Sequence, residues 1–259
     1  MTAMDKMPLT EHLGELRKRL IVALIAAGIG FGVCFFYSEK LFYLLTFPLH
    51  TTIKFSLLTP FIIFETVSDA QRQLVFLAPA EAFWMHLKVS MVCGIIIVLP
   101  VIFYELWKFI SPGLKAKEKK YVLPFVITVT FLFLAGALFC FLIVLPFAMN
   151  FLITYKTENL KPMLSVGSYV DFCLKFIIAF GAIFELPVVL VFLTRMGIVA
   201  TDTLAKNRKY AVLLAFVAAA LLTPTPDAFN QTLMAVPIIL LYEVGILASR
   251  ILKTSPKKE

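Results

Sequence analysis

Residues 9–37 read LTEHLGELRKRLIVALIAAGIGFGVCFFY, a charged segment that runs directly into an apolar one. The apolar part, residues 20–37, contains no charged side chain. About 20 such residues suffice to cross the hydrocarbon core of a bilayer as a helix. The run is too long for the apolar region of a signal peptide, and no A-x-A cleavage site follows it. We therefore expect the first membrane-spanning helix at this position.

The remaining composition extends this reading to the whole chain. Of 259 residues, 61% are hydrophobic, and the mean hydropathy is +0.93, which indicates a polytopic membrane protein. The apolar runs predict six spans, at about 20–37, 83–110, 121–150, 170–194, 210–223 and 232–249. The fifth would be only about 21 Å long, against a hydrocarbon core of about 30 Å. We expect one all-α membrane domain, 1–259, whose last two spans are short and thin the bilayer locally.

Lysine and arginine residues indicate the orientation of these spans. They gather before the first span, between the second and third, between the fourth and fifth, and after the sixth. Loops rich in these cations remain in the cytoplasm, so both termini are expected there. The net charge of +8 then reflects loops near an anionic membrane surface, and no nucleic-acid partner is expected. The outer loop, 38–82, contains the apolar segments LFYLLTF and TPFIIFETV, which predict short helices or caps on the bundle.

Motifs for common catalytic chemistry are absent from the sequence. There is no HExxH, GxSxG, P-loop or G-x-G-x-x-G segment. The three histidines, His12, His50 and His86, are too far apart in the sequence to suggest a ligand set. We expect no metal, no cofactor and no enzymatic activity.

Two acidic residues on the cytoplasmic side need an explanation. Glu15 lies one helical turn before Arg19, so an ion pair within the helix is the simplest reading. Glu118 is the one carboxylate among four lysines in SPGLKAKEKKY, 111–121, which alone would indicate a solvated loop. Together, however, the two acids would form a carboxylate pair suited to a cationic ligand.

A third acid, Glu185, lies within the fourth predicted span. A charge at the centre of a membrane helix costs about 2.5–3.5 kcal/mol on insertion scales, so such residues are functional by default. The alternative is that its side chain extends towards the cytoplasmic interface. That alternative explains Glu105 and Glu243 better, because both lie near the cytoplasmic ends of their spans.

Four segments in the same order resemble the TatC family, the multi-spanning subunit of the twin-arginine protein translocase. They are PLTEHLGELRKRL (8–20), LPVIFYELWKFISPGL (99–114), AFGAIFELPVVL (179–190) and LLTPTPDAFNQTLMAVPIILLYEVGI (221–246). The resemblance implies a glove-shaped bundle of six helices in the prokaryotic cytoplasmic (inner) membrane. It also implies recognition of signal peptides with two adjacent arginines, so that folded proteins are exported by the proton-motive force.

The resemblance also implies roles for individual residues. Glu15 and Glu118 would bind the twin arginines, and Glu185 would be a polar anchor in the membrane. The other roles fall on Leu13, Leu16 and Arg17 (supporting N-terminal motif), Pro48 and Asp227 (outer face), and Thr223 and Gln231 (partner docking). The implied partners are the single-span subunits TatA and TatB, signal peptides, further copies of the chain and membrane lipids.

Two other classes of membrane protein remain as alternatives. A small-solute secondary transporter would need a site at the middle of the membrane between paired repeats, and the sequence has one acid there and no paired halves. An intramembrane enzyme would need a nucleophile and base, or metal ligands, at membrane depth.

Overall fold

Helices form most of the structure, a computed structural model that describes residues 9–55, 62–66, 72–110, 122–154, 163–223 and 228–252. The chain divides into two compact units. Unit 1 comprises Met1–Tyr43 and Phe83–Phe131, and unit 2 comprises Leu44–Ala82 and Leu132–Glu259. Whether these units act as the single membrane domain expected from the sequence stays a prediction.

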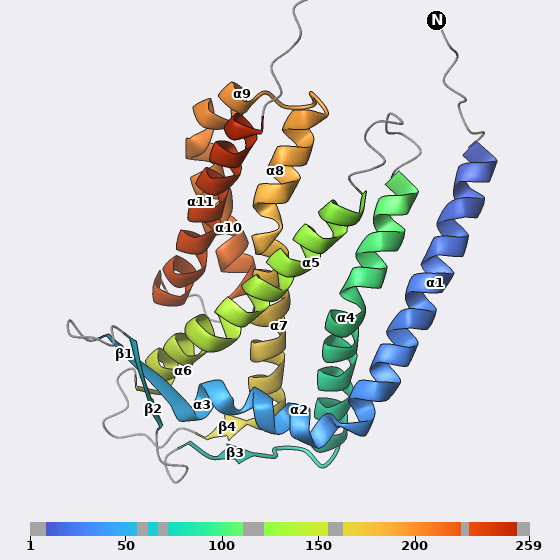
Figure 1. Ribbon diagram of the computed structural model, residues 1–259. Coiled ribbons are helices and arrows are strands. Elements are labelled where there is room, and N and C mark those ends of the chain that lie inside the picture. The colour runs from blue at the N-terminus through green and yellow to red at the C-terminus, as the bar shows by residue number, and fades with distance from the viewer. Residues whose placement is uncertain are drawn as a thin grey trace, which may run out of the picture. The chain divides into compact units, whose positions relative to one another are not determined.

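Unit 1 is built on two long antiparallel helices, α1 (Leu9–Phe36) and α4 (Glu81–Ile110) (Figure 1). Near one end the ring of His12 stacks on Phe109, with centroids 4.4 Å apart. Further along, Gly30 meets Gly94. As the residue number rises on one helix it falls on the other, which is the register of an antiparallel pair. Unit 1 also includes the first residues of α2 (Ser38–Leu45) and of α5 (Val122–Phe139).

The closest approach of α1 and α4 occurs where both helices have a glycine. A Cβ atom on Gly30 would lie 2.7 Å from the carbonyl oxygen of Gly94, and one on Gly94 would lie 2.6 Å from the backbone nitrogen of Phe31. Real Cβ atoms do not approach backbone so closely. Helices in a membrane associate by such close packing of small residues, because lipid gives no hydrophobic force between them.

Unit 2 contains the rest of the helices. They are η4, a π-helical turn (Cys140–Val144), α6 (Leu145–Thr154), α7 (Val166–Phe184), α8 (Leu186–Arg195), α9 (Thr201–Lys206), α10 (Arg208–Leu222) and α11 (Ala228–Ile251). Helix α11 packs closely on α8. A Cβ on Gly245 would lie only 3.1 Å from the Cα of Pro187. Helices α10 and α11 form an antiparallel hairpin (Figure 1).

Prolines explain two interruptions in the helices of unit 2. Pro146 is the second residue after the π-helical turn, and without an N–H group it cannot bond to the carbonyl one turn earlier. Pro187 is the second residue of α8, so the chain ends α7 at Phe184 and starts α8 at Leu186. The single long fourth span expected from the sequence is therefore two helices joined at Glu185.

The outer loop folds as short helices, as expected, and also as strands, which were not expected. Helix α3 (Phe47–His50) leads into β1 (Thr51–Phe55), which pairs antiparallel with β2 (Ile62–Thr66). Strand β3 (Leu74–Val75) pairs in parallel with β4 (Leu164–Ser165). The hydroxyl of Tyr169 on α7 donates to the carbonyl of Leu45 at 2.6 Å, so the loop is held on the helices of unit 2.

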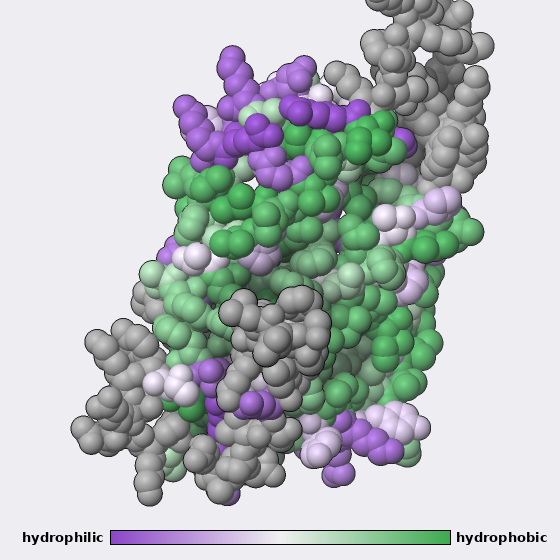
Figure 2. Space-filling model, turned by 60° about the vertical axis from the view of Figure 1, so that its left-hand side comes forward, coloured by the Kyte–Doolittle hydropathy of each residue, from purple (hydrophilic) through white to green (hydrophobic). Residues whose placement is uncertain are grey.

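Five described segments are long and apolar enough to cross a membrane: Glu11–Phe36, Glu81–Ile110, Leu123–Thr154, Val166–Arg195 and Ala228–Ile251. They match five of the six predicted spans. The sixth was expected to be short, and this was wrong, because its helix α11 has 24 residues. The fifth predicted span corresponds to α10, which has 15 residues. Figure 2 shows hydrophobic side chains over the middle of the helices of unit 2 and hydrophilic ones gathered at the end where α9 lies. The presence of a short helix is confirmed, and its passage across the membrane stays a prediction.

The glycine contact leads to a prediction about stability. Gly30→Ala or Gly94→Ala should force α1 and α4 apart, at a cost of about 1–3 kcal/mol for overpacking. Gly28→Ala and Gly32→Ala are matched controls, because a Cβ on either has no neighbour within 4 Å. Thermal unfolding in detergent should show a lower midpoint for the first two variants and no loss for the controls. Equal midpoints for all four would contradict the close approach.

Candidate functional site

The predicted cytoplasmic end of unit 1 holds a cluster of three charged side chains. The Arg19 guanidinium donates through Nη2 to Glu15 Oε1, one turn earlier on α1. Through Nη1 it donates to Glu105 Oε2 on α4, at 3.1 Å. The side chains are 15% (Arg19), 23% (Glu15) and 15% (Glu105) exposed. The ion pair expected between Glu15 and Arg19 is therefore confirmed, and Glu105 is a third member.

Glu105 was expected to extend towards the cytoplasmic interface, which stays a prediction, and its ion pair was not foreseen. Its carboxylate is bound to Arg19. The same holds for Glu243, whose carboxylate receives two hydrogen bonds from Arg208, at 2.6 and 2.9 Å. An acid near the end of one span, opposite the basic cluster of another, is a signal that predicts such a pair.

The cluster leaves two buried polar atoms without a bond among the described residues, Arg19 Nε and one oxygen of Glu15. Glu15 Oε2 is buried and has no hydrogen-bond partner among the described residues. Two carboxylates share one guanidinium, so the three side chains together carry one negative charge. His12 and Lys108 add positive potential at Glu15, which reduces the attraction for a cation at long range. A cationic ligand would therefore be held by hydrogen bonds to the free oxygen more than by net charge.

The leucines near this cluster lie on the surface. Leu13 is 62% exposed and Leu16 is 40% exposed, so neither is buried against α4. Arg17 is exposed as well. Apolar side chains next to a carboxylate suit a ligand that has cations followed by an apolar segment. The support that the N-terminal motif gives to binding stays a prediction.

Glu118 and Asp227 lie outside the described residues. The structure therefore neither brings Glu118 near Glu15 nor separates them, and the carboxylate pair stays a prediction. Among the residues from 9 to 252 that are described, no three His, Cys, Asp or Glu side chains are grouped as metal ligands would be.

Glu185 occupies the junction between α7 and α8. Its Oε1 is buried without a hydrogen-bond partner in the described part of the chain. The junction is held tightly from α5, since a Cβ on Gly136 would lie 2.6 Å from the carbonyl oxygen of Phe180. An unpaired carboxylate oxygen at membrane depth needs a partner or a proton.

The residues predicted for the hairpin and outer face have structural bonds of their own. The Thr223 hydroxyl donates to the carbonyl of Ala219 at 2.9 Å, and the Gln231 amide donates to the carbonyl of Phe216 at 3.1 Å. Gln231 therefore joins α11 to α10. Pro48 is buried within α3.

One buried cation of the outer loop has a role that the sequence did not suggest. The Arg72 guanidinium donates to the carbonyl of Leu49 and to Oδ1 of Asn150, each at 2.8 Å. The residue is only 6% exposed, and this burial lowers the pKa of its guanidinium. Arg72 thus ties the outer loop to α3 and α6. No local pattern marks it, because its partners lie 23 and 78 positions away.

Comparison with known proteins gives one consistent result. Residues 11–237 match the family described as Sec-independent protein translocase protein (TatC). The chain is similar to the TatC protein of Desulforapulum autotrophicum, at 43% identity over 95% of this chain and 86% of the relative. It is also similar to that of Aquifex aeolicus, at 40% identity over 98% of both chains.

Solved structures agree with these sequence matches. A crystal structure described as the twin arginine translocase receptor TatC superimposes with a TM-score of 0.75 at 36% identity, covering 93% of this chain and 98% of the other. A second, in DDM, gives a TM-score of 0.76 at 38% identity, covering 91% and 98%.

The Arg72 contacts predict a loss of stability on substitution. Arg72→Leu should remove the donors to Leu49 and Asn150 and leave the buried carbonyl of Leu49 unbonded, at a cost of about 1–3 kcal/mol, together with the half-buried amide oxygen of Asn150. Gln73→Leu is the control, because the neighbouring Gln73 is exposed. Thermal unfolding in detergent should show a clearly lower midpoint for the first variant alone. A midpoint equal to that of the control would rule out Arg72 as an anchor.

Proposed function

Because the chain belongs to the TatC family of Sec-independent protein translocases, we propose that it is the signal-peptide receptor and core subunit of its translocase. As a translocase subunit it is a membrane-embedded transport protein and not an enzyme. The proposed ligand is a signal peptide with two adjacent arginines, carried by a folded precursor that the proton-motive force drives across the membrane.

The free oxygen of Glu15 is the observation that carries this proposal. The other oxygen of Glu15 already accepts a hydrogen bond from the Arg19 guanidinium, so this carboxylate is ionised and suited to accept from a second guanidinium. A guanidinium is a planar fork that bonds to carboxylates in fixed directions, whereas a lysine ammonium is a compact point charge. A site built from carboxylate oxygens therefore prefers arginine to lysine.

Magnitudes indicate why two carboxylates would be needed. A fully exposed ion pair contributes only about 0–1 kcal/mol. The Glu15 side chain is 23% exposed, and a charge-assisted hydrogen bond in such a setting contributes about 1.5–3 kcal/mol. Loss of two such bonds would reduce affinity by about 100-fold. We propose that Glu118 is the second acceptor and that Glu11, exposed on α1, takes no part.

The proposed setting is the prokaryotic cytoplasmic (inner) membrane, with six spans, a glove-like bundle and both termini in the cytoplasm. The distribution of lysine and arginine between the spans supports this orientation. The five long apolar segments and α10 support the number of spans.

The single-span subunits TatA and TatB are the proposed partners at the α10–α11 hairpin. Thr223 and Gln231 are already bonded to carbonyls of α10. Close to them, Leu221 is 81% exposed and Val236 is 45% exposed. Docking would therefore use these apolar side chains, with Thr223 and Gln231 fixing the shape of the hairpin. Further copies of the chain and the two subunits together would supply the passage that one chain is too small to enclose.

Glu185 is proposed as a polar anchor that contacts a partner helix in the membrane. Its buried, unbonded oxygen supports this role, because a partner's hydrogen-bond donor would satisfy it. A part in proton coupling would require the carboxyl group itself.

Photo-crosslinking of a signal peptide to the membrane-embedded chain tests the receptor role. An Arg-Arg peptide should label the chain, and Glu15→Ala or Glu118→Ala should each lower its affinity by about tenfold, since each removes one charge-assisted bond. A Lys-Lys peptide should bind weakly to every form. Glu11→Ala is the matched control on the same helix and should behave as wild type. Labelling that ignores the arginines and both glutamates would return Glu15 to a purely structural pair with Arg19.

Substitution of Glu185 separates the anchor role from proton coupling. Glu185→Gln should keep export near the wild-type rate, because an amide still offers hydrogen bonds at the same position. Glu185→Leu, of similar size, should reduce export strongly. Export rates in membrane vesicles measure both. Loss of export with the Gln variant, restored by Glu185→Asp, would show that the carboxyl group is required.

A further inference from the structure

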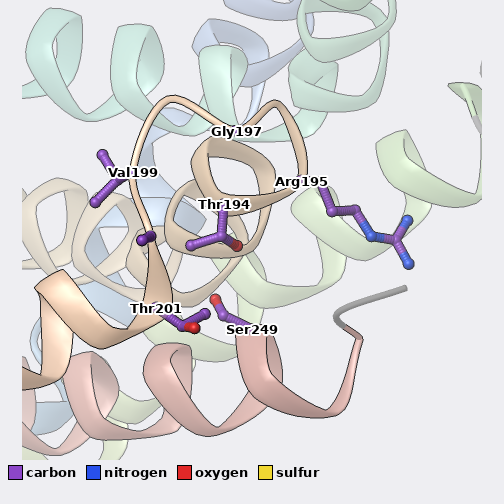
Figure 3. A pocket seen from close by; sticks show the side chains of 7 residues that line it. Thr194, Arg195, Gly197, Val199, Thr201 and Ser249 are labelled. Carbon is purple, nitrogen blue, oxygen red and sulfur yellow. The ribbon is translucent and has the colours of Figure 1, made fainter. Parts of the chain in front are cut away.

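A pocket of about 300 Å³ lies in unit 2 where α8, the loop after it, α9 and α11 meet (Figure 3). Its lining includes Thr194 and Arg195 at the end of α8, Thr201 at the start of α9 and Ser249 near the end of α11. The proposed signal-peptide site lies in unit 1 and uses none of these residues. The pocket therefore needs an explanation of its own.

Two buried hydroxyl groups face this pocket. Ser249 is 2% exposed and Thr201 is 3% exposed. Ser249 Oγ has no hydrogen-bond partner among the described residues, and in Figure 3 it points into the space bordered by Thr194 and Thr201. Serine in a helix ordinarily bonds to the carbonyl one turn earlier. A buried hydroxyl without a hydrogen bond lowers stability, so a ligand atom that accepts a hydrogen bond from it would restore the lost stability.

Positive charge surrounds the opening of the pocket. Arg195 is exposed, and its guanidinium points outward in Figure 3. Arg250 follows Ser249 on α11, and Lys206 ends α9. The acids on α8, α9 and α11 reduce this positive potential little. Glu243 is neutralised by its ion pair with Arg208, and among the described residues of these three helices the remaining acid is Asp202 on α9. The rim therefore favours an anion.

The end of α8 does not oppose an anion strongly. A helix C-terminus carries partial negative charge on its last carbonyls. Here the carbonyls of Phe192, Leu193 and Thr194 accept hydrogen bonds from the turn that follows, at 3.0 to 3.1 Å. Gly197 makes this turn possible with φ of +73°.

The depth of the pocket points to a lipid. Two segments long and apolar enough to cross the membrane end beside it, Val166–Arg195 and Ala228–Ile251. In the orientation proposed above, these ends would lie on the cytoplasmic side, where the hydrocarbon gives way to phospholipid headgroups. Basic pockets between membrane helices on the cytoplasmic side are suited to anionic headgroups.

We propose that this pocket binds the phosphodiester headgroup of an anionic phospholipid, a function beyond signal-peptide reception. The hydroxyls of Ser249 and Thr201 donate to phosphate oxygens, and Arg195 turns inward to pair with the charge. The bound lipid fixes α8 to α11 at the membrane surface.

Native mass spectrometry of the full chain in detergent tests the proposal. The probes are phosphatidylglycerol, phosphatidylethanolamine and inorganic phosphate. The wild-type chain should retain one phosphatidylglycerol molecule in preference to phosphatidylethanolamine. Arg195→Gln and Ser249→Ala should each weaken retention by about tenfold, the effect of losing one charge-assisted hydrogen bond. Inorganic phosphate at millimolar concentration should not displace the lipid.

Two control variants exclude a general loss of charge or polarity. Arg17→Gln removes the same charge from α1 in unit 1, which contributes no residue to the lining, and Thr203→Ala removes an exposed hydroxyl from α9. Both should retain the lipid as wild type does. Equal losses for Arg195→Gln and Arg17→Gln, or equal retention of the two lipids, would overturn the site. Displacement by inorganic phosphate would assign the pocket to a soluble anion and overturn the lipid. Arg195 is exposed, so its variant keeps the test decisive if Ser249→Ala does not fold.

Discussion

Hydrocarbon forms no hydrogen bonds, and this constraint underlies the whole structure. Each backbone group that crosses the membrane must bond within its own segment, which leaves the helix as the solution for this chain. The strands β1 to β4 occur only in the outer loop and at the start of α7, where other polar groups are available. Interruptions at Pro146 and Pro187 are tolerated because both prolines are buried in packed protein. The Glu185 junction is one of them, so its polar side chain is placed at a break that packing already supports.

The same constraint governs the charges. A cation or carboxylate near the hydrocarbon must find an opposite charge or a set of bonds. Arg19 joins Glu15 and Glu105, and thereby holds α1 to α4. Arg208 holds α10 to α11 through Glu243, although both side chains are about half exposed and the pair contributes only about 0–1 kcal/mol. In the receptor proposed above, structure and recognition would use the same groups, because Glu15 bonds to Arg19 through one oxygen and would offer the other to a guest guanidinium.

Packing between helices then depends on small residues. Gly30 against Gly94 and Gly245 against α8 bring backbones together where a side chain would keep them apart. Such contacts position the charged ends of the helices, since a shift of one turn between α1 and α4 would separate Arg19 from Glu105. The unbonded hydroxyl of Ser249 depends in the same way on where α11 meets α8 and α9.

Local pattern in the sequence determined the five long apolar segments, the short helix α10 and the Glu15–Arg19 pair, because apolar length and one-turn spacing need no knowledge of neighbouring helices. It also carried the family resemblance, through four ordered segments. Tertiary structure alone decided that Glu105 binds Arg19, that Glu243 binds Arg208, that Arg72 anchors the outer loop and that Ser249 faces a pocket. The partners of Glu105 and Arg72 are up to 86 residues away in the chain, and only the register of packed helices brings them together.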